Sequence, residues 1–346
     1  MDQENKKKNI TRKDFLRISG SLVAGGAIAG ISGKLIYNMV RNPEKVFYEA
    51  EGDAYQIPDG DDSVSPYKKV LSIKTDNTIE AFDLEENRMV AAGEGTLTVY
   101  SSEGNVESSF TVGPDVRDIC VDRDAIYLLF PARIAVYNPS GTLLREWAAC
   151  SDNSDYCSLT VSPAGVYVTD VFAKNICHYT HDGSLVRFIE SPDGFVVPSY
   201  CFGIASHDGI IYCSNPGRHR VERYTEDGRY LSCFGQAGTA KGSFSGCCNP
   251  VHLSVSEAGE ILTCEKGIPR ISCFAPDGTF RSVILNRKAL GGGYDAYEAR
   301  IAPDGRIAVS GKNAITLYKY DPQLAQGNAC AACGVANCPI RRGITV

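Results

Sequence analysis

Residues 162–183 read SPAGVYVTDVFAKNICHYTHDG, and this stretch contains the unit that decides the fold. A Ser-Pro-Ala-Gly turn precedes residues 166–170, a run of β-branched and aromatic residues that is typical of a strand. A further strand-type run ends at Tyr179, four residues before the Asp-Gly turn signal at Gly183. The stretch therefore predicts short antiparallel strands that are joined by tight turns.

The same unit recurs along the chain. An aromatic residue stands four positions before a turn glycine in five pairs, namely Tyr100 and Gly104, Tyr137 and Gly141, Tyr179 and Gly183, Tyr224 and Gly228, and Phe274 and Gly278. The spacing between these glycines varies from 37 to 50 residues, which is typical of stacked repeats with insertions in their loops. Because four short strands cannot bury both of their faces alone, the units are expected to pack around an axis.

The repeat predicts an all-β, six-bladed β-propeller. The six units lie near residues 77–113, 116–150, 155–193, 199–235, 250–286 and 295–320. The last unit lacks a fourth strand, since Tyr320 runs directly into Asp321 and Pro322. Residues 70–74, ahead of the first unit, can supply this strand and so remove the open edge of the ring. Five or seven blades are the alternatives.

Composition divides the chain into four segments. Residues 1–40 form a signal or membrane anchor, residues 41–66 an acidic linker, residues 67–322 the propeller, and residues 323–346 a cysteine-rich tail. The formal net charge is -6, and the basic residues concentrate at the start of the chain. An acidic body argues against nucleic acid as a partner, because phosphate binding requires clustered Lys and Arg.

The N-terminus has the features of an export signal. A basic start is followed by sixteen uncharged residues, 18–33. Arg12, Lys13, Phe15 and Leu16 resemble the twin-arginine (Tat) consensus, with Lys13 in place of the second arginine. The resemblance implies export of a folded protein across a bacterial cytoplasmic membrane into the periplasm. Residues 18–40 are long enough to span a bilayer, so the segment is either cleaved or kept as an inner-membrane anchor. A cytosolic protein with an amphipathic N-terminal helix is the alternative.

One link between units points to a family. It resembles the NHL-repeat motif FG-x2-G-x3-G-x-F…P, which is matched here by Phe234, Gly235, Gly238, Gly242, Phe244 and Pro250. Residues 246–250, Gly-Cys-Cys-Asn-Pro, resemble the blade junction of a bacterial NHL subgroup. The resemblance implies an NHL/TolB-like propeller. Such propellers mostly bind proteins or ligands, and some relatives are lyases or metal-dependent hydrolases, so the fold alone does not choose the function.

Fourteen cysteines exceed ordinary usage and require an explanation. In a propeller, the loop before the first strand and the loop between the second and third strands lie on the same face. This face is therefore predicted to carry a mouth formed by Cys157, Cys201, Cys247, Cys248, Asn249, Glu265, Lys266 and Arg270. The mouth could bind a metal, perform thiol–disulfide chemistry aided by a nearby cation, or simply pack the blade junction. A disulfide between the adjacent Cys247 and Cys248 would be strained, because neighbouring Cα atoms lie about 3.8 Å apart.

The tail contains Cys330, Cys333 and Cys338. Its Cys-x2-Cys opening and Cys-Pro close resemble fragments of ferredoxin motifs, although the x4 spacing differs and a fourth ligand must come from elsewhere. The resemblance implies an iron–sulfur cluster. Zinc, a disulfide with one free thiol, or no shared role are the alternatives.

Three functions follow from these features. The first is an exported redox or electron-transfer accessory protein with a metal site in its tail, which acts with envelope partner proteins. The second is a propeller scaffold for an envelope complex. The third is an enzyme at the mouth that acts on a small molecule, and it ranks last because the sequence offers no clear general base to pair with a nucleophile.

Overall fold

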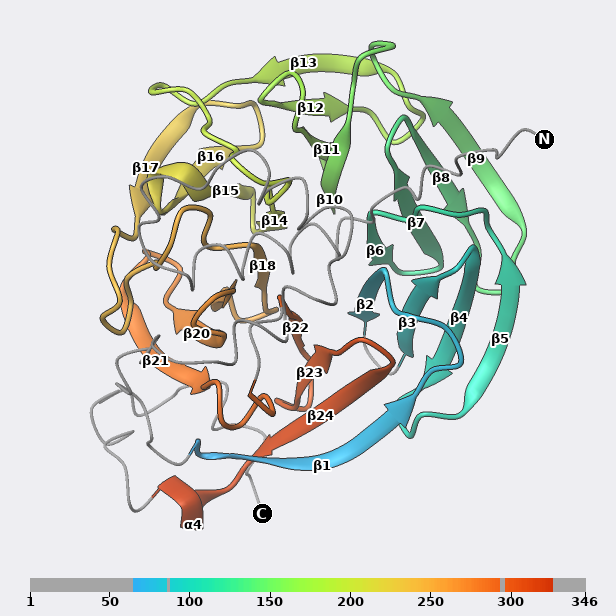
Figure 1. The fold of residues 1–346 in the computed structure, drawn as a ribbon. Coiled ribbons are helices and arrows are strands. Elements are labelled where there is room, and N and C mark those ends of the chain that lie inside the picture. The colour runs from blue at the N-terminus through green and yellow to red at the C-terminus, as the bar shows by residue number, and fades with distance from the viewer. Residues whose placement is uncertain (1–64, 86–87, 293–295, 326–346) are drawn as a thin grey trace, which may run out of the picture.

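The computed structural model describes residues 65–85, 88–292 and 296–325. Twenty-four strands form six four-stranded antiparallel sheets around a central axis, and the predicted six-bladed β-propeller is confirmed (Figure 1). Within these ranges, no helix is both long enough and apolar enough to cross a membrane. The signal residues Arg12, Lys13, Phe15 and Leu16 lie outside the described residues, as do the tail cysteines Cys330, Cys333 and Cys338.

The blades are numbered along the chain, each from its inner to its outer strand. Blade 1 comprises β2 (Ala81–Glu85), β3 (Arg88–Gly93), β4 (Thr96–Ser101) and β5 (Val106–Thr111). Blade 2 comprises β6 (Asp118–Asp122), β7 (Ala125–Phe130), β8 (Arg133–Tyr137) and β9 (Leu143–Ala148). Blade 3 comprises β10 (Tyr156–Ser162), β11 (Gly165–Asp170), β12 (Asn175–Tyr179) and β13 (Leu185–Ile189).

The remaining blades follow the same order. Blade 4 comprises β14 (Ile204–His207), β15 (Ile210–Asn215), β16 (Arg220–Thr225) and β17 (Tyr230–Phe234), with the 3-10 helix η1 (Pro216–Arg218) between β15 and β16. Blade 5 comprises β18 (His252–Val255), β19 (Ile261–Glu265), β20 (Arg270–Phe274) and β21 (Phe280–Leu285). Blade 6 comprises β22 (Glu298–Ile301), β23 (Ile307–Ser310), β24 (Ala314–Tyr320) and β1 (Tyr67–Lys74), and α4 (Pro322–Ala325) follows it.

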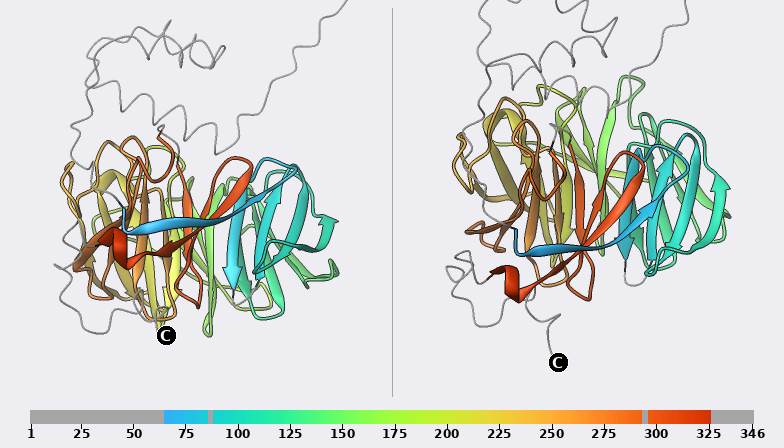
Figure 2. Two further views of the ribbon diagram at one scale, coloured as in Figure 1. Left: turned by 90° about the horizontal axis from the view of Figure 1, so that it is seen from below. Right: turned by 60° about the horizontal axis from the view of Figure 1, so that its bottom comes forward.

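The ring closes through strands from the two ends of the propeller. β1 pairs antiparallel with β24 from Tyr67 opposite Tyr320 to Lys74 opposite Ala314. Figure 2 shows the ring from the side, with β1 running next to β24. The pairing confirms that a strand ahead of the first unit completes the last blade. Because β1 pairs with β24, the outer edge of β24 is not left open.

The core lies between neighbouring blades. The inner strands β2, β6, β10, β14, β18 and β22 contact one another in ring order. Apolar side chains of adjacent sheets form shared clusters, as where Val99 of blade 1 and Leu128 of blade 2 pack in one buried group. Because each sheet buries both faces in this way, the strands of the middle layers are apolar on both sides.

The repeated turn glycine is also a contact between blades. Gly183 has φ 92°, a left-handed conformation that favours glycine, and a Cβ at this position would lie 2.7 Å from the Trp147 ring of blade 2. The other four turn glycines share this arrangement, each facing the outer strand of the preceding blade: Gly104 on Ile73, Gly141 on Phe110, Gly228 on Ile189 and Gly278 on Phe234. The sequence repeat therefore records blade packing as well as turn geometry.

Candidate functional site

The link between blades 4 and 5 is a folded loop that carries the adjacent cysteines. Phe244 is fully buried in the apolar cluster between these blades. Its N–H donates to the carbonyl of Gln236 at 2.8 Å, and its carbonyl accepts from the N–H of Gly238 at 3.0 Å. The NHL-like motif thus folds the loop back on itself and directs residues 245–249 toward the junction of the two blades.

Asn249 joins this loop to the end of β19. Its side-chain amide donates to the carbonyl of Ser245 at 2.6 Å and to the carbonyl of Lys266 at 2.9 Å, and its Oδ1 accepts from the N–H of Lys266 at 2.9 Å. The loop before β18 and the loop after β19 therefore lie together, as the repeat predicts.

Three cysteines meet beside Lys266, and we call Cys201, Cys247 and Cys248 the thiol cluster. The Sγ atoms of Cys247 and Cys248 lie 3.4 Å apart, and the Cys201 thiol is in hydrogen-bond contact with Cys248. The Lys266 Nζ lies 3.1 Å from the Ser199 Oγ and 3.7 Å from the Cys201 Sγ. Lys266, Cys201 and Cys248 are buried, whereas Cys247 is exposed. The cluster is thus a buried group with one thiol at the surface.

The cluster stabilises a negative charge on Cys248. Hydrogen bonds from Cys201 and Cys247 lower the pKa of Cys248 far below its usual range, against the effect of burial, and the Lys266 ammonium lowers it further. The hydrogen bond to Cys248 raises the pKa of Cys247, and burial raises the pKa of Cys201. The arrangement therefore favours the thiolate of Cys248 over those of Cys201 and Cys247.

The backbone next to Cys201 is strained. Tyr200 has φ 43°, in the left-handed region that a bulky side chain rarely adopts. Its neighbours Ser199 and Cys201 both contact Lys266. Strained residues of this kind concentrate at functional sites, where the surrounding structure holds them in place.

Glu265 and Arg270 form a buried ion pair that contacts the loop between blades 4 and 5. The Arg270 Nε lies 2.6 Å from the Glu265 Oε1, and both side chains are buried. Arg270 also donates to the carbonyls of Thr239 and Ala240 in the loop, at 3.2 and 3.0 Å. Burial raises the pKa of Glu265, and Arg270 opposes this shift. The two residues therefore hold the loop in place.

Cys157 is separate from the cluster. Its thiol donates to the Tyr200 carbonyl at 3.1 Å, and it is fully buried with Cys213 among the apolar side chains between blades 3 and 4. Cys157 is the second residue of β10, and its side chain lies in the buried cluster between the sheets of blades 3 and 4. The structure thus brings together Cys201, Cys247, Cys248, Asn249 and Lys266, but not Cys157.

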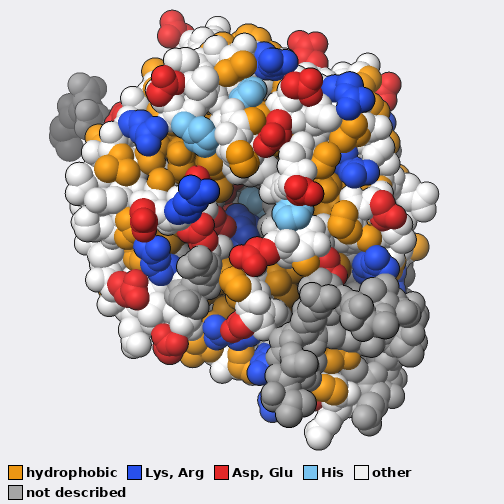
Figure 3. Space-filling view, turned by 180° about the vertical axis from the view of Figure 1, so that it is seen from behind, with side chains coloured by type: hydrophobic (Ala, Val, Ile, Leu, Met, Phe, Trp, Pro, Cys, Tyr) orange, Lys and Arg blue, Asp and Glu red, His pale blue; other side chains and the backbone are white. Residues whose placement is uncertain are grey.

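The inner strands carry a polar group in which only His252 had a signal in the sequence, because it lies just after residues 246–250. The Arg300 Nε lies 2.7 Å from the Asp83 Oδ1, and the His252 Nε2 lies 3.3 Å from the Glu298 Oε1. Asp118 on β6 accepts from the N–H of Leu159 at 3.0 Å. Figure 3 shows that one face of the ring is hollowed near its centre, with charged and histidine side chains around the hollow. These residues are scattered along the chain, and no motif relates them.

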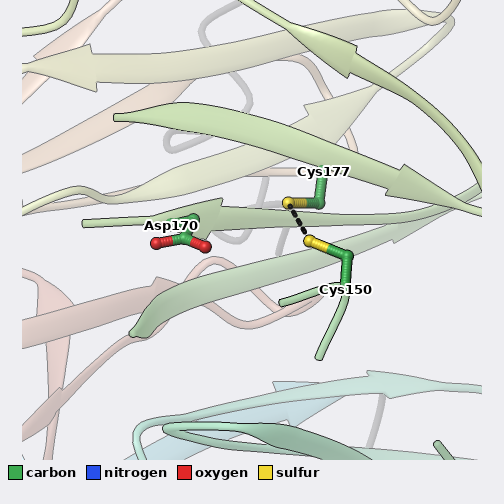
Figure 4. Close-up of side chains that lie close together, drawn as sticks. All are labelled: Cys150, Asp170 and Cys177. Carbon is green, nitrogen blue, oxygen red and sulfur yellow. Dashed lines mark hydrogen bonds between the residues drawn. The ribbon is translucent and has the colours of Figure 1, made fainter. Parts of the chain in front are cut away.

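A second cysteine pair also gave no signal in the sequence. The Sγ atoms of Cys150 and Cys177 lie 3.7 Å apart beside Asp170 in blade 3 (Figure 4). Burial would raise the pKa of Cys150, but hydrogen bonds from Tyr156, Ser154, Tyr179 and Cys177 together lower it. The sequence contains a signal for Asp170, because Asp170 occupies the same position in its repeat as Glu265 does in blade 5. It contains no such signal for Cys150 or Cys177.

Comparison with known proteins identifies the fold alone. No protein-family model matches the chain, and no curated protein matches it in sequence, so membership of the NHL family stays a prediction. A structural-genomics protein of unknown function from Bacteroides thetaiotaomicron superposes with a TM-score of 0.55 at 15% identity, covering 74% of each chain.

Two enzymes have a similar fold. A catalytically inactive virginiamycin B lyase from Staphylococcus aureus, with quinupristin, gives a TM-score of 0.50 at 16% identity, covering 73% of this chain and 88% of the lyase. A luciferin-regenerating enzyme gives 0.51 at 12% identity, covering 73% of this chain and 94% of the enzyme. The neighbours of this propeller thus include enzymes and a protein of unknown function.

Proposed function

We propose that the chain is a thiol-based redox protein in which Cys247 and Cys248 exchange electrons with a disulfide partner. The observation that carries the proposal is the 3.4 Å contact between an exposed thiol and a buried sulfur next to the Lys266 ammonium. Sequence reasoning ranked catalysis at the mouth last for want of a base. Cys248 needs no base, because the hydrogen bonds from Cys201 and Cys247 and the nearby Lys266 ammonium favour its thiolate.

The chemistry balances without a further reactant. Cys247 gives its proton to water and attacks one sulfur of the partner disulfide, which forms a mixed disulfide and releases a partner thiolate. The Cys248 thiolate then attacks the Cys247 sulfur and expels the second partner thiolate, and one of the two partner thiolates takes up the proton from water. The partner gains two electrons and one proton, and the protein is left with a disulfide between adjacent cysteines, which is strained and readily reduced again.

The predictions of export, of a metal site in the tail and of envelope partners are compatible with this proposed function. Export to the periplasm through the Tat-like segment would place the cluster where disulfides persist. An iron–sulfur cluster on Cys330, Cys333 and Cys338 would give the tail a role in electron transfer, in addition to the role of the thiol cluster. Zinc is the alternative metal at these cysteines. The partners would be envelope proteins that present an accessible disulfide.

Trapping with oxidised glutathione tests the proposal. Removal of the second thiol in C248S should leave Cys247 held as a mixed disulfide with glutathione, which peptide mass mapping detects. The wild type should pass on to an internal disulfide, and C247S should give no adduct in this loop because Cys248 is buried. K266M removes one of the groups that lower the pKa of Cys248, so the pH below which the reaction stops at the mixed disulfide should be higher than in the wild type.

Cys233 provides the matched control, because it is an exposed thiol on the outer strand β17. Its reaction with glutathione should be the same in the wild type, C248S and K266M. Equal reactivity of Cys247 and Cys233 in all three proteins would refute the proposed redox pair.

A scaffold is the second candidate, and one surface favours it. The outer strand β13 exposes three large apolar side chains, Leu185, Val186 and Phe188, each at 42% or more. An exposed apolar patch on an edge strand is a typical site for a partner chain. The propeller could therefore hold a partner on blade 3 whether or not the thiol cluster reacts.

A further inference from the structure

Blade 3 holds three side chains that could ligate one cation. Cys150 lies in the link before β10, Asp170 is the last residue of β11, and Cys177 lies within β12. Each offers one ligand atom, and these three atoms all lie within 4.8 Å of one another. Figure 4 shows the two sulfurs facing each other beside the carboxylate. The three residues are here called the blade-3 cluster.

Asp170 has a buried oxygen without a partner. The side chain is fully buried, and its Oδ1 accepts from the N–H groups of Asp155, Phe172 and Ala173 at 3.2, 2.9 and 3.1 Å. Its Oδ2 is buried with no hydrogen-bond partner among residues 65–85, 88–292 and 296–325. Buried polar atoms are nearly always satisfied, so an unpartnered carboxylate oxygen beside two sulfurs points to a missing cation.

The repeat shows what the other blades have at this place. Glu265 in blade 5 stands opposite Arg270, and Asn215 in blade 4 stands opposite Arg220. Asp170 stands opposite Asn175, which is neutral. The described part of the chain gives Asp170 no ion pair within 4 Å. A bound metal would therefore take the place that Arg270 fills beside Glu265 in blade 5.

We propose that the blade-3 cluster is a zinc site. Two thiolates and a carboxylate suit Zn²⁺, whereas Ca²⁺ and Mg²⁺ prefer oxygen ligands alone and Cu(I) prefers sulfur. Three protein ligands leave a fourth position for water. Two contacts fix the position of Cys150: its N–H donates to the Tyr156 hydroxyl at 3.0 Å, and its Sγ lies 3.7 Å from the Ser154 Oγ. A disulfide between the two cysteines would use both sulfurs but would leave the Asp170 oxygen without a partner.

Cobalt substitution tests the site by a spectroscopic readout. The full chain should carry serine at Cys330, Cys333 and Cys338, so that the tail cannot bind the probe, and it should be purified anaerobically with reductant. Titration with Co²⁺ is expected to give one ion per chain with a thiolate-to-cobalt charge-transfer band, and Zn²⁺ should displace it. C150S should abolish the band, and D170N, which keeps both thiols, should weaken cobalt binding at least tenfold.

Two controls show whether cobalt binds at the blade-3 cluster itself. C150S changes a surface residue, so its circular dichroism spectrum should stay that of the parent. C213A removes a buried cysteine of blade 4 and should leave cobalt binding unchanged. The proposal fails if the parent binds no cobalt after reduction, if the band persists in C150S, or if D170N binds cobalt as tightly as the parent. A stable Cys150–Cys177 disulfide that gives no metal uptake once it is reduced would also overturn it.

Discussion

Replacement of Arg270 by Met tests the buried ion pair that supports the thiol loop. The side chains of Arg270 and Glu265 are only 8% and 1% exposed, so removal of the cation leaves a buried carboxylate uncompensated. Breaking such a pair from one side typically costs about 3–5 kcal/mol. At roughly 2–4 °C per kcal/mol for domains of 150–250 residues, the melting temperature of R270M should fall by about 10 °C.

The loss should depend on pH in a defined direction. Burial already raises the pKa of Glu265 above 4.5, and removal of Arg270 should raise it further. A raised pKa in the folded state favours the protonated carboxyl, so the destabilisation is largest at neutral pH. It should shrink as the pH falls through the raised pKa of Glu265 toward 4.5, because a neutral carboxyl does not need the arginine. E265Q/R270M, which removes the buried charge, should recover part of the loss.

Urea denaturation at pH 7 and pH 5 measures both effects. The matched control is R306M, because Arg306 pairs with Asp304 at the surface, with exposed fractions of 24% and 52%. That pair should contribute less than about 1 kcal/mol. If R270M and R306M unfold at the same urea concentration, or if the R270M loss does not depend on pH, the reasoning about this buried pair is wrong.

Two further predictions concern the blades themselves. In denaturant titrations, G183A should lower the free energy of unfolding by about 2 kcal/mol or more, because residue 183 has a left-handed backbone and the new Cβ would lie 2.7 Å from Trp147. Gly209 also has a positive φ, but no atom lies within 4 Å of a Cβ built there, so G209A should lose only about 1 kcal/mol. Replacing Leu185, Val186 and Phe188, the exposed apolar side chains of β13, by serine should change the free energy of unfolding by less than about 0.5 kcal/mol. The same substitutions should abolish the cross-linking of any partner that binds to blade 3. If the cross-linking is unchanged, β13 is not the docking surface.

The fold could be predicted from the sequence because its decisive signals are local and repeated. The interval from Tyr179 to Gly183 fits within one turn, and its recurrence in five units defines the repeat. The number of blades was less certain, because the last unit lacks a fourth strand and five or seven blades were the alternatives. Even the closing strand could be predicted, since the missing fourth strand after Tyr320 left one place for residues 70–74.

The site was only partly predictable, because its contacts join different blades. The repeat predicted that Cys248 lies near Lys266, but the contact from Lys266 to Ser199 spans 67 residues and follows no spacing rule. The blade-3 cluster comes from a link, a strand end and a strand interior, so no motif marks it. Packing also decides which buried cluster a cysteine joins: Cys201 packs with Cys248, whereas Cys157 packs between blades 3 and 4.

The pairing of β1 with β24 also has a mechanical consequence. Because the strands are antiparallel and Tyr67 stands opposite Tyr320, the chain enters and leaves the propeller at the same end of one ladder. A pull on the segments before Tyr67 and after Tyr320 would load the ladder bonds one at a time, like a zipper, rather than all at once in shear. The first contacts to be loaded would be the hydrogen bond from the Asp321 N–H to the Pro66 carbonyl, at 2.8 Å, and the edge-to-face pair of these two tyrosine rings. The ring of blades would then open at blade 6, where the two ends of the propeller meet.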